Sequence, residues 1–420
     1  MYLTKAAPFL FFFFCISCGR QVTPFDNAMS NDAGVEVEKQ SAEVPQTPPA
    51  STPPKPKTML EFALGFLKFA PNDENFCFSP YSLQHAFAMT YAGADGETKT
   101  EIETVFGFSD EVHANFHLSQ QRYTAAEESV VQAANRLFID STVELMEPFR
   151  TTMKQHYGTD AEQLSFRTDP EGSRNDINQW VGKQTKGQIE TLLPAGSITP
   201  LTQLALVNAL TFEDRWKRPF SKEKTNATGL FYPSATVQKT LPMMKQIEVF
   251  KYAEDEFWQM VELPYLSDLS MVVLLPKPEV TVSTARAQLT SETLEAGLAN
   301  LQAQKISLML PQFKLDSTVP GKDMLLKMGL EKPFSVEQAD FGRMTPHNDV
   351  VIEDVFHQTV VKVDEAGTKA AAATAVTMMK RSANVPPKTQ VHVERPFVFL
   401  IHNAETKEIL FIGQVIDPSI

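Results

Sequence analysis

Residues 363–382 read VDEAGTKAAAATAVTMMKRS, and this stretch decides how the rest of the chain is interpreted. Ala is the best helix former, so a short surface helix is one interpretation. However, Gly367 and Thr368 stand at its start without periodic apolar residues behind them, and Thr, Val and Thr recur toward its end, which favours extended chain. As a strand, the segment would turn a set of small or apolar side chains to one face: Thr368, Ala370, Ala372, Thr374, Val376 and Met378. Such a segment could pair as an extra strand in an existing sheet.

The composition of the chain indicates a large globular core. Its 420 residues are 43% hydrophobic and include 30 Phe, which excludes a mostly disordered protein. The 38 basic and 51 acidic residues give a net charge of −13, which argues against general binding to nucleic acid or to an anionic membrane. Three Cys in a chain of this length exclude a disulfide scaffold.

The amino terminus is predicted to be a signal peptide over residues 1–17. Lys5 supplies a short positive region, and the apolar run Phe9–Ile16 is too short to span a bilayer, which needs roughly 20 residues. The segment Cys15-Ile16-Ser17-Cys18 resembles a bacterial lipobox, although Cys15 stands where Leu is usual. It predicts acylation of Cys18 and a place at the bacterial cell envelope or surface, anchored to a membrane by the lipid. Ordinary secretion to the extracellular side, with cleavage near Ser17, is the alternative.

Residues 18–57 are predicted to be a disordered tether. The stretch 41–57 contains six Pro with Ser, Thr and Lys between them, and it cannot bury enough apolar surface to offset its chain entropy. Behind a lipid anchor it would hold a domain away from the membrane, and a dispensable tail is the alternative.

Residues 58–420 are predicted to form one continuous α+β domain. A helix-spaced apolar pattern begins at Met59 and ends before Pro71. Helical patterns dominate the first half and strands the second. Four strands are visible by composition, with residues 403–407 as a hairpin connection between the last two: Ser270–Leu275, Ile306–Leu310, Phe397–Ile401 and Ile409–Ile416.

Motifs for catalysis and metal binding are incomplete. Residues 107–111 begin like a nucleophile elbow, but Glu111 replaces the second Gly. His113 and His117 share one helical face, yet a zinc site needs a further ligand, and two solvent-facing His are the alternative. Cys77 lies between two Phe, which predicts a buried, inert thiol. The sequence therefore predicts no enzyme, no metal and no cofactor.

Short motifs along the whole body resemble those of the serpins, a family of serine protease inhibitors. They stand in the same order over about 360 residues: NFCFSPYS (75–82), YAGADGET (91–98), INQWV (177–181), TKGQI (185–189), LVNALTF (206–212), LPY (263–265), RPF (395–397) and FIG (411–413). The resemblance implies three β-sheets, eight or nine helices and an exposed reactive loop. A protease attacks that loop, and the cleaved loop inserts into the central sheet and drags the protease with it.

The stretch quoted above resembles the hinge and reactive loop of an inhibitory serpin. The resemblance assigns the hinge to Glu365, Gly367, Thr368, Ala370, Ala371, Ala372, Ala373 and Thr374. Inhibitory members need small, uncharged residues here because an isolated buried charge costs several kcal/mol. Non-inhibitory members, which act as binding proteins or chaperones, typically interrupt this stretch. An inhibitor is therefore favoured, a binding protein comes second, and a membrane-anchored hydrolase third.

Counting 16 residues from Glu365 puts the reactive bond between Arg381 and Ser382, preceded by Met378, Met379 and Lys380. An Arg at this place suits a trypsin-like serine protease, and an Arg- or Lys-specific cysteine protease would also accept it. Because Lys380 is basic too, a shift of one residue would change little. A monomer is expected, without heparin activation, because residues 109–130 hold one Arg and no Lys.

Four residues match the polar shutter of the family, which lies under the strands that open: Ser79, Ser82, Asn208 and His357. A Ser with a His also invites a catalytic interpretation. A satisfied buried hydrogen-bond network is favoured over it.

Overall fold

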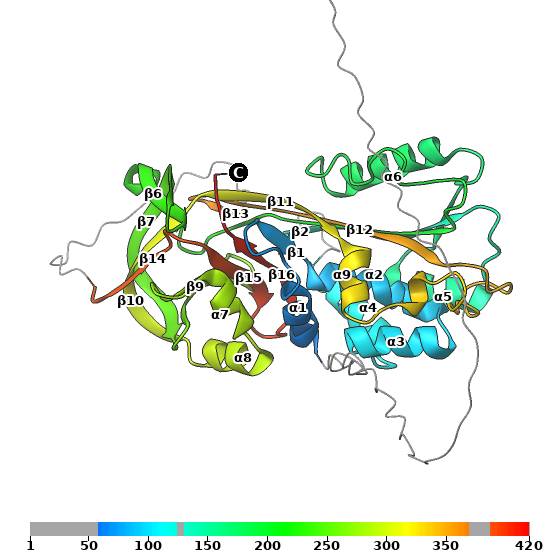
Figure 1. Ribbon diagram of the computed structural model, residues 1–420, viewed down its shortest axis with the longest axis horizontal. Helices are drawn as coiled ribbons and strands as arrows, with labels where there is room; N and C mark the ends of the chain where they lie inside the picture. The colour runs from blue at the N-terminus through cyan, green and yellow to red at the C-terminus, as the bar shows by residue number, and fades with distance from the viewer. Residues whose placement is uncertain (1–57, 124–129, 369–386, 420) are drawn as a thin grey trace, which may run out of the picture. The chain divides into compact units, whose positions relative to one another are not determined.

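The computed structural model describes residues 58–123, 130–368 and 387–419, which form an α+β body (Figure 1). Thr52–Ile420 is one compact unit, and its described part holds nine α-helices and two short 3₁₀ helices. The α-helices are α1 (Met59–Leu67), α2 (Pro80–Gly93), α3 (Gly96–Phe106), α4 (Val112–Tyr123), α5 (Glu147–Tyr157), α6 (Pro170–Gln184), α7 (Val282–Ala287), α8 (Ser291–Ala299) and α9 (Gly321–Lys327). Among these described helices none has the length and apolar character needed to cross a membrane. The 3₁₀ helices are η1 (Lys222–Lys224) and η2 (Lys332–Phe334).

The central sheet has seven strands, several of which run along the body side by side in Figure 1. Its order is β3 (Glu162–Leu164), β2 (Val131–Asp140), β4 (Leu204–Phe212), β12 (Ile352–Val363), β13 (Gly367–Thr368) and β5 (Asp214–Arg215), with β11 (Phe313–Pro320) also paired to β12. Strands β2 and β4 both lie in the first half of the chain and carry few charges. The prediction that helical patterns dominate this half did not include either strand.

The second sheet has nine strands and contains all four strands predicted by composition, as β9, β10, β15 and β16. It consists of β1 (Phe76–Phe78), β16 (Ile409–Val415), β15 (Phe397–Asn403), β9 (Leu269–Pro276), β8 (Trp258–Pro264), β7 (Val237–Glu254), β10 (Gln302–Pro311) and β14 (Thr389–His392), with β6 (Asn226–Ser234) paired to β7. The predicted connection at 403–407 joins β15 to β16, where the Asn403 amide donates to the Glu408 carbonyl at 3.0 Å.

Hydrogen bonding joins the described strands into two networks, where three separate sheets were expected. The cause is β7, which is 18 residues long. Its first half pairs with β6, its last four residues pair with β8, and β10 pairs with most of its length. Two of the expected sheets are therefore continuous through β7 and β10.

Both faces of the central sheet are covered, which explains the sequence of β4. Its residues Ala205, Val207 and Ala209 pack in the core formed with α6, whereas Leu206 and Leu210 pack in the larger core on the other face. Figure 1 shows α6 on one side of this sheet and α2 on the other. A strand buried on both faces reads as a continuous apolar run without alternation. The exception in the middle of this run is the polar Asn208.

The start of α2 is fixed by local sequence. Ser79 has extended backbone, and its hydroxyl accepts a hydrogen bond from the Ser82 amide at 3.0 Å, while Pro80 occupies the first turn. Both features are typical of a helix start because they satisfy or remove the unpaired amides there. The helix is buried almost throughout, so it is anchored directly beneath the central sheet.

Candidate functional site

Strands β4 and β12 are neighbours in the central sheet and run parallel. Their register extends from Leu204 opposite Ile352 to Thr211 opposite Val360. A strand placed between two parallel strands would be antiparallel to both if it ran the opposite way. Antiparallel pairing is slightly more stable per residue than parallel pairing. The sheet therefore gains hydrogen bonding if a strand of that direction separates β4 from β12.

The chain itself begins to occupy this place. After β12 it turns back, and β13 pairs antiparallel with the end of β12 through Val363 and Thr368. On its other side β13 pairs antiparallel with β5, which follows β4, through Gly367 and Arg215 and through Thr368 and Asp214. The two residues of β13 thus lie between the extensions of the two parallel strands. Residues 369–386 follow directly.

Thr368 is the last described residue of this hinge, and its side chain is fully buried. Its hydroxyl forms a 2.7 Å hydrogen bond with the hydroxyl of Tyr265. Burial raises the pKa of Tyr265 well above its ordinary value, so the phenol is neutral here. The Tyr265 ring is stacked on that of Trp216, with 4.3 Å between the ring centroids. The side chain of residue 368 therefore lies in a buried site beside the aromatic Tyr265 and its neutral hydroxyl, where a bulky charged side chain would be costly.

The turn before β13 is held by the segment that follows β4. The amide of Trp216 donates to the Ala366 carbonyl and its indole Nε1 to the Asp364 carbonyl, both at 2.9 Å. Glu365 is buried; its carbonyl accepts from the Phe220 amide at 2.9 Å, and its carboxylate accepts from the Thr225 hydroxyl at 2.6 Å. These bonds fix the point from which residues 369–386 start.

Gly367 is required by close packing at this point. A Cβ on residue 367 would collide with the backbone carbonyl of Asp214 and lie 2.7 Å from the Cα of Arg215. Any other residue would push β13 away from β5.

The four predicted shutter residues lie together beneath β4 and β12, and all are fully buried. His357 on β12 bonds through Nδ1 to the side-chain oxygen of Asn208 on β4, and its Nε2 accepts from the Ser79 amide at 3.0 Å. The Asn208 amide donates to the Ser82 carbonyl at 2.5 Å. Because His357 and Asn208 are register partners, their bond crosses the boundary at which a strand would have to insert.

This network is not a nucleophile and base. Ser79 meets His357 through its backbone amide, and its hydroxyl caps α2. Burial lowers the pKa of His357 to about 3, so the imidazole is neutral and acts as both donor and acceptor. The arrangement satisfies buried polar groups and activates none of them.

Other predicted residues lie partly inside and partly outside the described ranges. Cys77 is buried, as predicted, and burial raises the pKa of its thiol to about 12. His113 and His117 share one face of α4, and both are partly exposed to solvent. The predicted leader, Cys18 and the tether lie outside the described residues. So do these loop residues: Ala370, Ala371, Ala372, Ala373, Thr374, Met378, Met379, Lys380, Arg381 and Ser382.

Comparison with known proteins decides the family. Residues 58–418 match the family model described as Serpin (serine protease inhibitor). The chain is 34% identical over 371 residues to Serpin B6 of Pongo abelii, covering 85% of this chain and 97% of that protein. It is 35% identical over 381 residues to antithrombin-III of Mus musculus, covering 87% and 82%. The chain belongs to the serpin family. The crystal structure of Tengpin, a thermophilic serpin in the native state, is similar with a TM-score of 0.78 and 26% identity, over 86% of this chain and 93% of that one.

Family membership confirms the resemblance seen in the sequence motifs. Family membership also agrees with the interpretation that the Ser79–His357 network is structural, because serpins are protease inhibitors and not enzymes. In this serpin the parallel pair β4–β12, the hinge at β13 and the network around His357 lie along one line of the central sheet.

Sequence reasoning missed Asn135 as a member of the serpin shutter. Its side-chain oxygen accepts from the Ser82 hydroxyl at 2.7 Å and from the Asn208 amide at 3.1 Å, so β2 is tied to α2 and β4. The available signal was a polar residue within a stretch that otherwise fits a buried strand. Its partners are 53 and 73 residues away in sequence, so the contact could not be anticipated.

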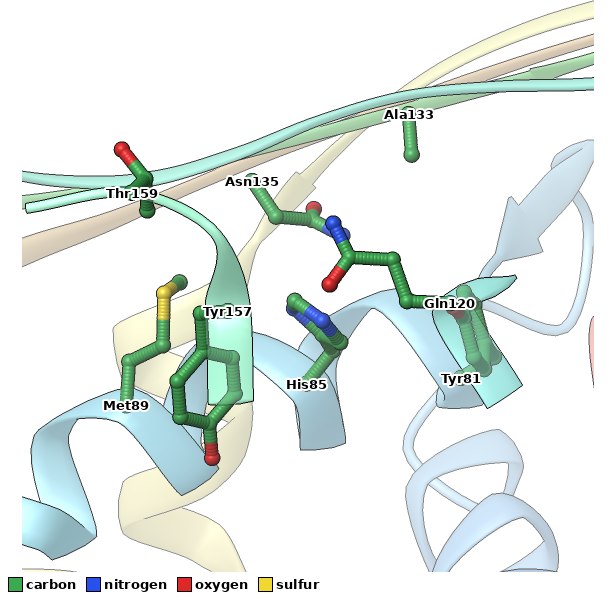
Figure 2. Close-up of a pocket in the computed structure, with 8 residues that line it drawn as sticks. All are labelled: Tyr81, His85, Met89, Gln120, Ala133, Asn135, Tyr157 and Thr159. Carbon is green, nitrogen blue, oxygen red and sulfur yellow. The ribbon is translucent and has the colours of Figure 1, made fainter. Parts of the chain in front are cut away.

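Asn135 also borders a small polar cavity of about 50 Å³ in this serpin (Figure 2). The Gln120 side chain of α4 reaches between Asn135 and His85, while Tyr81 and Tyr157 close the sides. Burial lowers the pKa of His85 to about 4, so this imidazole is neutral as well. A cavity of this size and polarity suits an ordered water rather than a ligand.

Proposed function

We propose that this serpin is an inhibitor that traps trypsin-like serine proteases by cleavage of its reactive loop and insertion of the loop into the central sheet. The observation that carries the proposal is the place of β13. This strand already lies between the ends of β12 and β5 in the antiparallel direction. To insert, residues 369–381 would extend β13 in the same direction, between β4 and β12.

The chemistry begins with the protease. Its catalytic serine would attack the carbonyl carbon of Arg381, form an ester to Arg381 and release the amino group of Ser382 when the peptide bond breaks. The cut frees the loop at its distal end while Thr368 stays anchored. The loop can then separate β4 from β12 and form two antiparallel ladders in place of one parallel ladder. Serpin loop insertion is an established example of strand addition and of stored strain released by proteolysis.

The length of the loop fits this movement. The sixteen residues that follow Glu365, up to Arg381, at ~3.3 Å each, span on the order of 50 Å. Strand β12 has 12 residues and is therefore ~40 Å long. A fully inserted loop would reach the far end of β12, and the protease bound to Arg381 would move with it.

The sequence of the loop supports insertion and suggests the target. Thr368 and Ala370–Ala373 are small and uncharged, and Lys369, the one charged residue among them, alternates to the opposite face of the strand from Thr368. Arg381, with Lys380 before it, suits proteases whose specificity pocket is acidic. Trypsin-like serine proteases are the proposed partners, and Arg- or Lys-specific cysteine proteases are a second class.

The test is to mix the full chain with trypsin at near-equal molarity and to run a denaturing gel. We expect a denaturant-stable band at the summed mass of serpin and protease. The band should be absent for Arg381→Glu and present for Arg343→Glu, a matched charge reversal at an exposed position. Complete cleavage with trypsin still active would contradict trapping, and the binding-protein or chaperone function would then be favoured.

We also infer that the protein is exported and held at a bacterial cell envelope or surface by a lipid on Cys18. The support is the lipobox-like segment at residues 15–18 and the Pro-rich segment behind it. Labelled fatty acid should be incorporated by the parent chain in a bacterial host and not by Cys18→Ser. Equal labelling of both chains would overturn the lipid anchor, and release of unlabelled protein would indicate ordinary secretion.

A further inference from the structure

Strand β7 exposes two neighbouring apolar side chains. Ile247 and Val249 are 52% and 39% exposed. They stand two residues apart on one strand, so both side chains point to the same face of the sheet. In the register with β10 they lie opposite Ser307 and Lys305. Exposed apolar side chains with a polar rim are typical of a surface that binds another protein.

A basic residue lies on each side of this apolar pair. On one side, the Arg218 guanidinium donates to the Val249 carbonyl at 2.6 Å, and the Arg218 carbonyl accepts from the Gln246 side chain at 3.3 Å. On the other side, Lys305 is the register partner of Val249. Arg218 and Lys305 are both exposed. The rim is therefore positively charged at both edges of β7.

A third basic residue continues this row toward the reactive loop. The sheet order is β7, β10, β14, and Figure 1 shows these strands at one end of the body. Strand β14 pairs in parallel with β10, with Thr389 opposite Ile306, so Lys388 comes level with Lys305. Lys388 is exposed. We call these five residues the β7 patch: Arg218, Ile247, Val249, Lys305 and Lys388.

The charge of the β7 patch is opposite to that of the whole chain. The chain carries a net charge of −13, yet residues 215–224 include five basic residues and one acidic residue, Glu223. On β7 itself, Lys245 and Glu248 are both exposed and offset each other. The patch is therefore a local positive surface on a negative molecule.

The β7 patch lies within reach of a protease bound at the reactive bond. Arg381 is six residues before residue 387, which is the first described residue after the loop, so the two are at most about 22 Å apart. Strand β7 is two strands from β14, or roughly 10 Å. A protease of trypsin size, with roughly 220 residues, is about 40 Å across. Its surface beside the active-site cleft can therefore cover the patch while Arg381 occupies the cleft.

We propose that the β7 patch is a docking surface for the target protease, and that it selects a protease whose surface beside the active-site cleft is acidic. This inference rests on the proposed function, in which the protease attacks Arg381. The basic residues attract the acidic surface, and Ile247 and Val249 supply apolar contact once the two proteins meet. Complementary charges raise the rate of association more than they raise final affinity. The patch therefore acts on the encounter with the protease and leaves the chemistry at Arg381 unchanged.

The test compares two double charge reversals in the full chain. Arg218→Glu/Lys305→Glu changes the patch, and Lys154→Glu/Arg343→Glu makes the same change of net charge at two exposed positions elsewhere. Each is mixed with an anionic and with a cationic form of trypsin, which share the specificity for Arg and Lys. The rate constant for cleavage after Arg381 is measured at low salt and at high salt.

With anionic trypsin at low salt, we expect the patch variant to be cleaved at least tenfold more slowly than the control variant. Steering by charge reaches this size and is screened by salt, so the difference should shrink at 0.5 M NaCl. With cationic trypsin the patch variant should be cleaved at least as fast as the control. Lys305→Glu/Lys388→Glu leaves the bond between Arg218 and Val249 in place, and it repeats the test if the first variant folds poorly.

The apolar part of the β7 patch has its own variant. Ile247→Ala/Val249→Ala should slow cleavage by anionic trypsin at least threefold, and this loss should persist at 0.5 M NaCl because apolar contact is not screened. An unchanged rate would contradict the apolar contact.

Equal rates for the patch variants and the control variant with anionic trypsin at low salt would overturn the docking surface. Slower cleavage of the patch variants by both trypsins alike would also overturn the selection by charge. Cleavage after Arg381 is counted whether the protease is trapped or released. A failure to trap would therefore count against the proposed function, while the rate comparison would still decide the role of the β7 patch.

Discussion

At the scale of single residues, His357 connects the two strands that loop insertion must separate. Its ring bonds Asn208 across the β4–β12 boundary and holds the amide of Ser79 at the start of α2. Both partners are fully buried, so bulk water does not reach them in the intact fold. We therefore expect this side chain to hold β4 and β12 together.

Replacement of His357 by Ala should destabilise this closed state. Each buried group left without a partner costs about 1–3 kcal/mol, and the Ser79 amide and the Asn208 oxygen would both be affected. We expect a lower melting temperature and more polymer on a native gel. Gln358→Ala, at the next residue of β12, removes a half-buried side chain that bonds Asp316 and has no contact with the His357 network, and it serves as the control. Unchanged melting temperature and unchanged yield of monomer would contradict this role.

Buried histidines also predict how stability depends on pH. Burial lowers the pKa of His357 to about 3 and that of His402 to about 4, against 6.5 in the unfolded chain. Below pH 6.5 the unfolded chain therefore binds more protons than the folded one, and the free energy of unfolding falls as pH decreases. Each such group contributes a slope of at most about 1.4 kcal/mol per pH unit.

Urea unfolding between pH 7 and pH 5 measures this slope. His357→Ala should be less pH-dependent than the parent by up to one proton, because the residue whose protonation opposes folding is gone. His347→Ala, at an exposed position, should keep the slope of the parent. Equal slopes for parent and His357→Ala would show that His357 is not held neutral by the fold.

At the scale of elements, β13 is the decisive strand although it is two residues long. It continues β12 through a turn that Trp216, Phe220 and Thr225 hold by hydrogen bonds to residues 364–366. Its direction is antiparallel to both neighbours. The element therefore sets the starting point and the direction of any further insertion.

Thr368→Arg should convert the inhibitor into a substrate. The side chain at 368 lies in a fully buried site next to the Tyr265 hydroxyl, where an unpaired guanidinium costs several kcal/mol. Trypsin should still cut at Arg381, but the denaturant-stable complex should fall at least tenfold in yield. Thr368→Ser keeps the hydroxyl and should trap as the parent does. A normal yield of complex from Thr368→Arg would show that the hinge tolerates charge during insertion.

At the scale of the whole molecule, the central sheet with β4 and β12 directly paired is not the arrangement with the most hydrogen bonds. Eight register pairs join the two strands in parallel. An inserted loop of about 13 residues would be paired on both sides, so the gain exceeds the loss. At about 1 kcal/mol per net hydrogen bond, the difference amounts to several kcal/mol.

Cleavage of the loop should therefore make the protein more stable. Parent chain that has been cut after Arg381, and freed of protease, should melt at least about 10 °C higher than intact chain. Cut Thr368→Arg should show a smaller rise, because displacement of β13 from its buried site would remove the start of the inserted strand. Differential scanning calorimetry of the four samples measures both effects. A cut parent chain that melts at or below the intact temperature would exclude insertion.

The sequence by itself determined the features that depend on neighbouring residues. Three features follow from local composition and spacing: the Ala-rich hinge after Thr368, the helix start at Ser79-Pro80 and the apolar strands of the second half. The ordered motifs of the body were enough to predict the serpin fold, and the family match confirms it. The reactive bond at Arg381 stays a prediction from the sequence.

The tertiary structure decided the features that depend on residues far apart in the chain. His357 meets Asn208 across 149 positions, and Thr368 meets Tyr265 across 103. The parallel pairing of β4 with β12, the contact of Asn135 with the shutter and the approach of His156 to α4 are of the same kind. Local periodicity records which face of an element is buried but not which element covers it. That choice is made when the sheets and helices pack, because only then do distant side chains meet.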